Sequence, residues 1–132
     1  MSTQVHEKYQ NNSIQTASPS ELTLMLYNGC LKFIKLAKRG IEEGNYESKN
    51  MYIQKAQNIV SELMITMDPE YEITKQIMPL YEYLNHRLLE ANMQNDVKIL
   101  DEVEGFVVEF RDTWKEVIKL TKNQQKGIVG NV

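Results

Sequence analysis

The stretch that decides the fold reads LDEVEGFVVEFRDTWKEV and spans residues 100–117. Its apolar residues recur at alternating spacings of three and four, at Leu100, Val103, Val107, Phe110, Trp114 and Val117. This spacing places them along one face of a helix, in the kind of seam by which helices pack at a crossing angle near 20°. The stretch therefore predicts an all-α protein in which long helices pack side by side.

A second helix can be delimited at both ends from capping signals. Ser18, Pro19 and Glu21 form a capping box with proline at the first helical position, which is typical of a helix start. Gly44 is a typical residue just beyond a helix end. We therefore predict a helix over about residues 19–43.

Apolar periodicity and end signals predict the remaining helices. Two helices are expected over about residues 47–67 and 73–94, and Pro79 predicts a kink or a late start in the second of them. The helix that contains the opening stretch is expected to run from Asp96, as its N-cap, to about Lys122.

The joints between most of these helices are short, which favours antiparallel packing of helices that follow one another along the chain. The predicted fold is an antiparallel up-down-up-down four-helix bundle over residues 18–122. The polar residues 1–17 are expected to form a mobile N-terminal tail, and residues 123–132 a disordered C-terminal tail.

Composition excludes several classes of function. A net charge of -3 argues against a nucleic-acid binder, and Cys30 as the single cysteine, with only two histidines, argues against a zinc finger. No apolar run approaches the ~18 residues that a membrane span needs, so we expect no direct membrane insertion. The polar N-terminus shows no secretion signal, so a cytoplasmic protein is expected.

No catalytic motif or cofactor motif is found, so we expect neither an enzyme nor a cofactor. His86 lies between Glu82 and Glu90 on one helix face, without the Glu-x-x-His repeat of di-iron bundles. A phosphotransfer bundle stays an alternative, although the residues after His86 are bulky and include Glu90. Cys30 is expected to be a small buried hydrophobe.

Three helices carry more apolar residues than one bundle-facing stripe requires. In the helix over residues 19–43 they fill about 240° of the circumference, against the ~100° stripe of an ordinary bundle helix. We expect the surplus to form exposed grooves that bind an amphipathic segment of a partner protein. The residues proposed for this role are Tyr27, Leu31, Ile34, Met51, Ile65, Met78, Leu89 and Met93. Burial by helix tilting, or pairing of these faces in a weak homodimer, remain the alternatives.

Several runs of the sequence are similar to one known family. The runs that carry the similarity are residues 9–13 (YQNNS), 16–29 (TASPSELTLMLYNG), 55–60 (KAQNIV), 80–84 (LYEYL), 87–92 (RLLEAN) and 110–112 (FRD), the last leading to Trp114. Together they resemble the FliS family of flagellar export chaperones over about residues 9–118.

The resemblance implies a cytoplasmic four-helix bundle that binds the disordered C-terminal segment of flagellin in apolar surface grooves. Such binding would prevent premature polymerisation and deliver flagellin to the flagellar type III export gate, at its component FlhA. The resemblance also implies that Tyr9 and Ile14 belong to a tail that covers an empty groove, and that Tyr9 touches the export gate.

Overall fold

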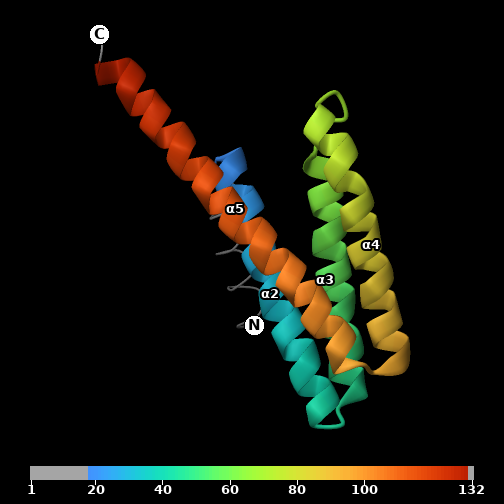
Figure 1. Ribbon diagram of the computed structural model, residues 1–132. Coiled ribbons are helices and arrows are strands. Elements are labelled where there is room, and N and C mark those ends of the chain that lie inside the picture. Colours follow the sequence, from blue (N-terminus) through green and yellow to red (C-terminus); the bar gives the residue numbers. More distant parts are fainter. Residues whose placement is uncertain (1–17, 131–132) are drawn as a thin grey trace, which may run out of the picture.

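The computed structural model describes residues 18–130 of the chain, with side chains described up to Lys122. Its elements are four helices: α2 (Pro19–Glu42), α3 (Tyr46–Thr66), α4 (Glu72–Gln94) and α5 (Val97–Gly130). Each helix packs on the next one along the chain, and α5 packs back on α2 (Figure 1). The prediction of an all-α, up-down-up-down four-helix bundle is confirmed for the part of the chain that the structure describes.

The ends of α2 follow the capping chemistry that the sequence predicts. The Ser18 hydroxyl accepts a hydrogen bond from the Glu21 backbone N–H at 3.2 Å. At the other end Gly44 has φ +70, a left-handed conformation that favours glycine. The chain then turns back at once, because the Asn45 N–H bonds to the Gly40 carbonyl at 2.8 Å. This tight turn makes α2 and α3 antiparallel neighbours.

The helix α4 begins at Glu72 and passes through Pro79. The start lies one residue before the predicted position 73, and of the two effects predicted for Pro79, a kink or a late start, the late start does not occur. The first turn is held instead by Thr74, which is buried and whose hydroxyl donates to the Asp68 carbonyl at 2.5 Å. Because this anchor is a contact with the preceding loop, the start of α4 does not depend on the backbone hydrogen bond that Pro79 lacks.

Asp96 caps α5 as predicted, since its carboxylate accepts a hydrogen bond from the Lys98 N–H at 2.9 Å. The preceding Asn95 adopts a left-handed conformation with φ 51 and ends α4. The helix α5 runs to Gly130, past the predicted end at Lys122. The residues that follow Lys122 contain no proline, and the first glycine comes at position 127, so the local helix propensity does not end there. The predicted tail 1–17 lies outside the described residues.

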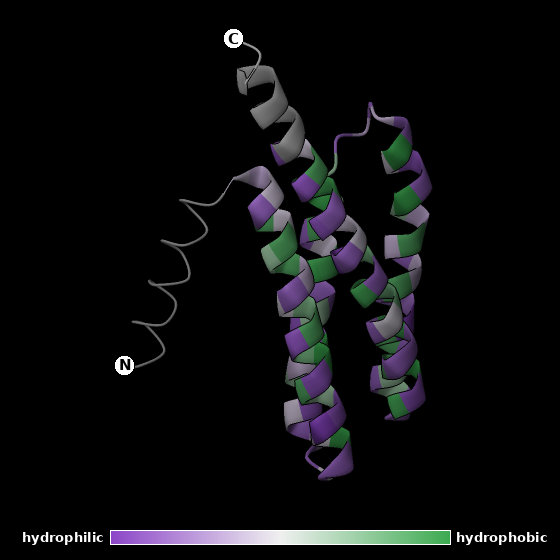
Figure 2. Cartoon of the chain, turned by 60° about the vertical axis from the view of Figure 1, so that its left-hand side comes forward, coloured by the Kyte–Doolittle hydropathy of each residue, from purple (hydrophilic) through white to green (hydrophobic). Residues whose placement is uncertain are grey.

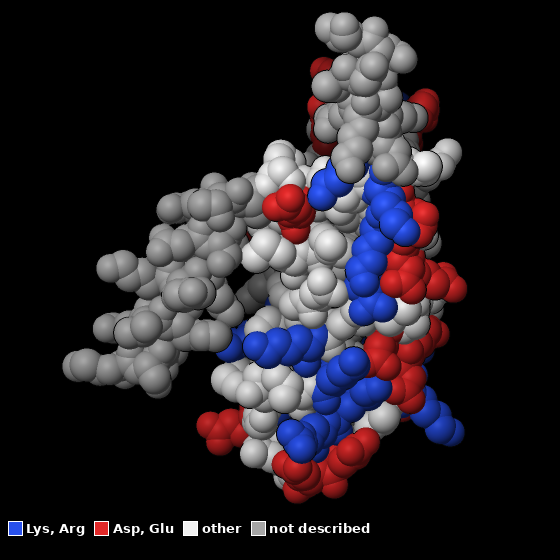
Figure 3. Space-filling view, turned by 90° about the vertical axis from the view of Figure 1, so that its left-hand side faces the viewer, with Lys and Arg blue, Asp and Glu red and all other residues white. Residues whose placement is uncertain are grey.

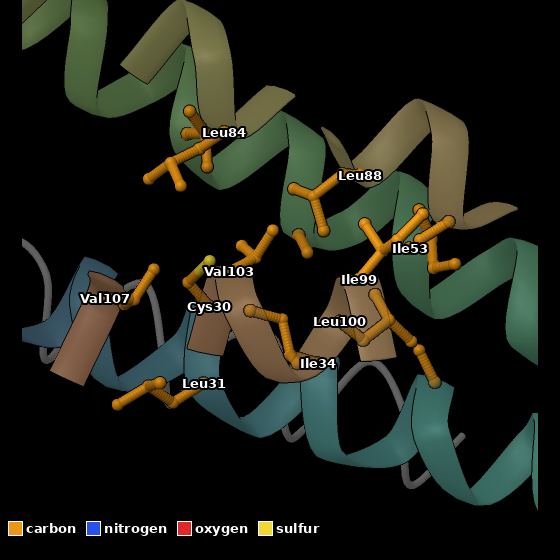
Figure 4. Close-up of a cluster of buried hydrophobic side chains, with 14 of the residues drawn as sticks. Cys30, Leu31, Ile34, Ile53, Leu84, Leu88, Ile99, Leu100, Val103 and Val107 are labelled. Carbon is orange, nitrogen blue, oxygen red and sulfur yellow. The ribbon is translucent and has the colours of Figure 1, made fainter. Parts of the chain in front are cut away.

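The core lies between the facing sides of the four helices, and Figure 2 shows hydrophobic and hydrophilic segments alternating along each of them. Leu84 and Leu88 of α4 point towards Val103 of α5 in this cluster (Figure 4). The opening seam of α5 is buried at Leu100, Val103 and Val107, whereas Val117 is exposed. The Trp114 indole N–H donates to the Ser20 carbonyl at 2.9 Å, in the first turn of α2. Residues of α5 that follow Trp114 therefore extend beyond the start of α2, which no longer covers them.

None of the helices within residues 18–130 has the length and apolar character that crossing a lipid bilayer requires.

Candidate functional site

The predicted groove residues on α2 are buried. Tyr27, Leu31 and Ile34 are each at most 5% exposed and belong to the core. The expectation that they stand on an open surface is wrong for all three. The physical reason is that α2 packs against both α3 and α5, so two neighbours cover its wide apolar arc.

The predicted residues on α3 and α4 lie at the surface. Met51 and Leu89 are about half exposed, Ile65 and Met93 are each 75% exposed, and Met78 is half-buried. Their exposure agrees with the sequence analysis, and their role in partner binding stays a prediction. Tyr9 and Ile14, the two predicted residues in the N-terminal segment, lie outside the described residues.

Three of these residues form a line along α4, which we call the α4 stripe: Met78, Leu89 and Met93. Their spacings of eleven and four residues keep them within about 60° of one another around the helix. The stripe lies on the α3 side of α4, because the neighbouring Asn85 amide donates to the Ser61 hydroxyl of α3 at 3.2 Å. Met51 and Ile65 of α3 do not extend it into a continuous groove, since they are about 21 Å apart along their own helix.

The opposite side of α4 is polar and tied to α5. The Arg87 guanidinium donates to the Glu102 carboxylate at 2.9 Å, and the Tyr83 hydroxyl donates to the same carboxylate at 3.0 Å. The hydrogen bond from Arg87 lowers the pKa of Glu102 below its ordinary value. The α5 side of α4 is therefore tied to the bundle by charged groups, whereas on the α3 side the exposed Leu89 and Met93 leave apolar atoms open beside the Asn85–Ser61 contact.

A pocket of about 310 Å³ opens at the end of the bundle where α3 connects to α4, and we call it the end pocket. All four helices and the α3–α4 loop contribute to it, and Figure 1 shows α2 and α5 diverging from α3 and α4 towards this end. Its lining consists of Thr23, Tyr27, Leu63, Thr66, Met67, Asp68, Tyr71, Ile73, Thr74, Ile77, Tyr81 and Trp114.

The buried part of the end pocket contains a pair of tyrosines. The hydroxyls of Tyr27 and Tyr81 are hydrogen-bonded at 2.5 Å, and both rings pack on Phe110, with centroid distances of 6.3 and 5.7 Å. Burial raises the pKa of both Tyr27 and Tyr81 above the ordinary value of 10.0. The pair therefore stays neutral at physiological pH, and each hydroxyl has the other as a hydrogen-bond partner in a pocket whose remaining lining is mainly apolar.

The rim of the end pocket is aromatic and aliphatic. Tyr71 and Ile73 are 64% and 55% exposed, and Trp114 is half-buried with its indole N–H held by Ser20. The sequence analysis missed this pocket, because it assigned Trp114 to the helix seam and treated the joint before α4 only as a connection. The available signal was the pair of large apolar residues, Tyr71 and Ile73, next to that joint.

The comparisons with known proteins agree with this architecture. The model of the family described as flagellar protein FliS matches residues 1–121. This chain belongs to the FliS family. The match takes in α2, α3, α4 and most of α5, so it includes both the end pocket and the α4 stripe. The resemblance found in the sequence is confirmed.

Individual FliS relatives are similar over most of their length. The flagellar secretion chaperone FliS of Bacillus subtilis (strain 168) is 48% identical over 122 residues, which cover 92% of each chain. The protein of the same name from Escherichia coli (strain K12) is 34% identical, over 80% of this chain and 79% of its own. The FliS protein of Salmonella typhimurium is 33% identical, over 80% of this chain and 81% of its own. All three of these relatives are named as flagellar secretion chaperones.

Two groups that the sequence analysis considered for catalysis or metal binding, His86 and Cys30, have structural surroundings in this FliS chain. His86 on α4 faces the Glu90 carboxylate at 2.8 Å. Cys30 is fully buried, as predicted, and burial raises its pKa to about 12, so the thiol stays protonated. Within the described residues no group of three or more metal-ligating side chains comes together. The end pocket and the α4 stripe offer apolar contact, which is the chemistry of binding.

Proposed function

We propose that this chain is a cytoplasmic export chaperone that binds the disordered C-terminal segment of flagellin on apolar surfaces of its bundle. Binding prevents premature polymerisation, and the complex is delivered to the flagellar type III export gate through its component FlhA. The observation that carries the proposal is the end pocket, an open apolar site that all four helices build in a chain of the FliS family.

A disordered client loses conformational entropy when it binds, so it needs a large apolar contact to offset that loss. The end pocket supplies a concave site for one or two anchor side chains, with Tyr71 and Ile73 on its rim. The α4 stripe supplies a second, convex contact. Its methionines suit this role, because flexible thioethers adapt to the side chains of a client.

We place the client on α3 and α4 and at the end pocket, which keeps the predicted surfaces of α3 and α4 and leaves out the predicted α2 residues Leu31 and Ile34. A bound helical segment of the client would present anchors at i, i+3, i+4 and i+7, over about two turns, to such a surface. We further propose that Tyr9 and Ile14 belong to a segment that covers the client site before binding, and that Tyr9 contacts the export gate.

The experiment is a calorimetric titration of the full chain with a synthetic C-terminal segment of flagellin from the same bacterium. We expect 1:1 binding with a negative heat-capacity change, the mark of buried apolar area. The control is a peptide of the same composition in scrambled order, which should bind much more weakly. Absence of heat with the native segment, or equal affinity for the scrambled one, would contradict the proposal.

Self-association is tested on the same sample. Light scattering on the eluate of a size-exclusion column gives the mass of the chain before and after the peptide is added. A stable dimer that dissociates as peptide binds would show that a second copy covers the client site at rest. A dimer that persists with no peptide bound would favour a self-associating bundle over the chaperone.

A further inference from the structure

Cations gather on one outer face of a chain whose net charge is -3. On α5, Arg111, Lys115, Lys119 and Lys122 recur at spacings of four, four and three, which places them on one stripe of the helix. Figure 3 shows Lys and Arg side chains forming a band on this face, with acidic residues along one side of it. We call the following residues the basic band: Lys32, Lys35, Arg111, Lys115, Lys119 and Lys122.

The two halves of the basic band meet at a shallow hollow of about 400 Å³ between α2 and α5. Lys32 and Lys35 of α2 and Arg111 of α5 stand around it, and Leu31 and Leu36 provide its aliphatic lining. The hollow shares no lining residue with the end pocket, so the two are separate sites on the bundle.

Most cations of the band have no carboxylate partner within the described side chains. Of its six members only Arg111 makes an ion pair there, with its sequence neighbour Asp112 at 3.1 Å. By contrast Lys38, on α2 just outside the band, is paired with both Asp101 and Glu104 at 3.0 Å. The band is therefore a row of like charges whose mutual repulsion an acidic partner would relieve.

We propose that the basic band binds an acidic helical segment of a partner protein, with carboxylates at i, i+4 spacing along the lysines and one aliphatic side chain in the hollow. Such a segment matches both the spacing of the cations and the aliphatic lining. Nucleic acid fits less well, because the hollow has no aromatic lining on which a base would stack and because Asp112 and Glu116 border the band. The inference is independent of the flagellin proposal.

The probe is a short fluorescein-labelled helical peptide of Glu, Ala and Leu, with Glu at i, i+4 spacing, and binding is followed by fluorescence anisotropy. Its matched control peptide has Gln in place of every Glu. We expect the Glu peptide to bind at least about tenfold more tightly than the Gln peptide, with an affinity that falls as salt is added. Equal affinities for the two peptides would overturn the proposal.

Charge reversal then locates the site. Lys32→Glu/Lys35→Glu should weaken binding of the Glu peptide about tenfold, from two lost attractions and two new repulsions at exposed positions. Lys75→Glu/Lys98→Glu changes the net charge equally at exposed positions outside the band, and should change affinity less than about twofold. An equal loss in both variants would show a net-charge effect and overturn the proposal.

Two further measurements identify the occupant. A double-stranded DNA oligonucleotide that binds as tightly as the Glu peptide would show a general polyanion site and contradict the proposal. The flagellin segment should bind Lys32→Glu/Lys35→Glu as tightly as it binds the unaltered chain. Weakened binding of flagellin to this variant would show that the basic band is part of the client site, and would overturn the proposal of a separate acidic partner. If flagellin binds neither chain, the flagellin proposal fails, and the comparison of the Glu and Gln peptides still decides the proposal for the basic band.

Discussion

Replacing the two most exposed residues of the α4 stripe, Leu89 and Met93, tests whether apolar contact at this surface binds the client. The double variant Leu89→Gln/Met93→Gln replaces each residue by glutamine, which is a good helix former of similar length but has a polar end. Leu89 is 46% exposed and Met93 is 75% exposed, so a client can bury about half of one side chain and three quarters of the other.

The expected loss follows from those exposed fractions. Complete burial of a Leu or Met side chain contributes ~2 kcal/mol, so the two positions contribute about 1 and about 1.5 kcal/mol to client binding. Together they amount to ~2.5 kcal/mol, which is a weakening of about 60-fold in Kd. By the same arithmetic the free energy of unfolding should fall by no more than about 1 kcal/mol for Leu89→Gln and ~0.5 kcal/mol for Met93→Gln, because about half and a quarter of these side chains are covered in the free chain.

The assay is calorimetric titration with the C-terminal flagellin segment, paired with urea unfolding followed by circular dichroism. Leu120→Gln is the control, since Leu120 is 59% exposed on α5 and lies outside the proposed client surface. It should leave the affinity unchanged. Binding of the α4 double variant within about twofold of the unaltered chain would refute the assignment of this surface. A large loss of stability would show instead that the stripe is part of the core.

Three further predictions concern the bundle itself. Ile34→Asp should lower the free energy of unfolding by at least ~4 kcal/mol, because it places an unpaired carboxylate in the core, and an unchanged melting temperature would contradict that burial. Gly40→Ala should lower the free energy of unfolding, measured in urea, by about 1 kcal/mol net, because the added Cβ would lie 3.0 Å from the backbone nitrogen of Lys49. A gain in stability would show that α2 and α3 can move apart to accept the methyl group. The raised pKa values of Tyr27 and Tyr81 predict that the contribution of this pair to the free energy of unfolding is fully present below pH 10.0 and decreases as the pH rises above it. The reason is that the tyrosines of the unfolded chain lose their protons at a lower pH than those of the folded chain. Tyr27→Phe/Tyr81→Phe should lose less stability between about pH 9 and 11, and an identical pH profile would contradict the neutral pair.

The binding surface is where sequence and structure differ most. Periodicity placed the surplus apolar residues of α2, α3 and α4 correctly around each helix, and those on α3 and α4 do lie at the surface. It could not say how many neighbours each helix has. Tyr27, Leu31 and Ile34 are buried because α2 lies between α3 and α5, which is a property of the packed bundle.

Local chemistry decided where the helices begin and end. Ser18, Gly44 and Asp96 act on backbone groups within a few residues of themselves, so capping signals read from the sequence predict those boundaries. The late start that Pro79 predicted as one alternative does not occur, because the start of α4 is anchored from outside the helix, by Thr74 on the carbonyl of Asp68.

The sequence by itself determined the helices, their antiparallel order and the family, since these depend on periodicity, short joints and motifs that lie close together in the chain. Only the tertiary structure decided which apolar residues remain open. The end pocket joins residues from Thr23 to Trp114, and the hollow in the basic band joins Lys32 to Arg111. Exposure depends on the distance between residues in space, and packing brings together positions that no spacing along the chain relates.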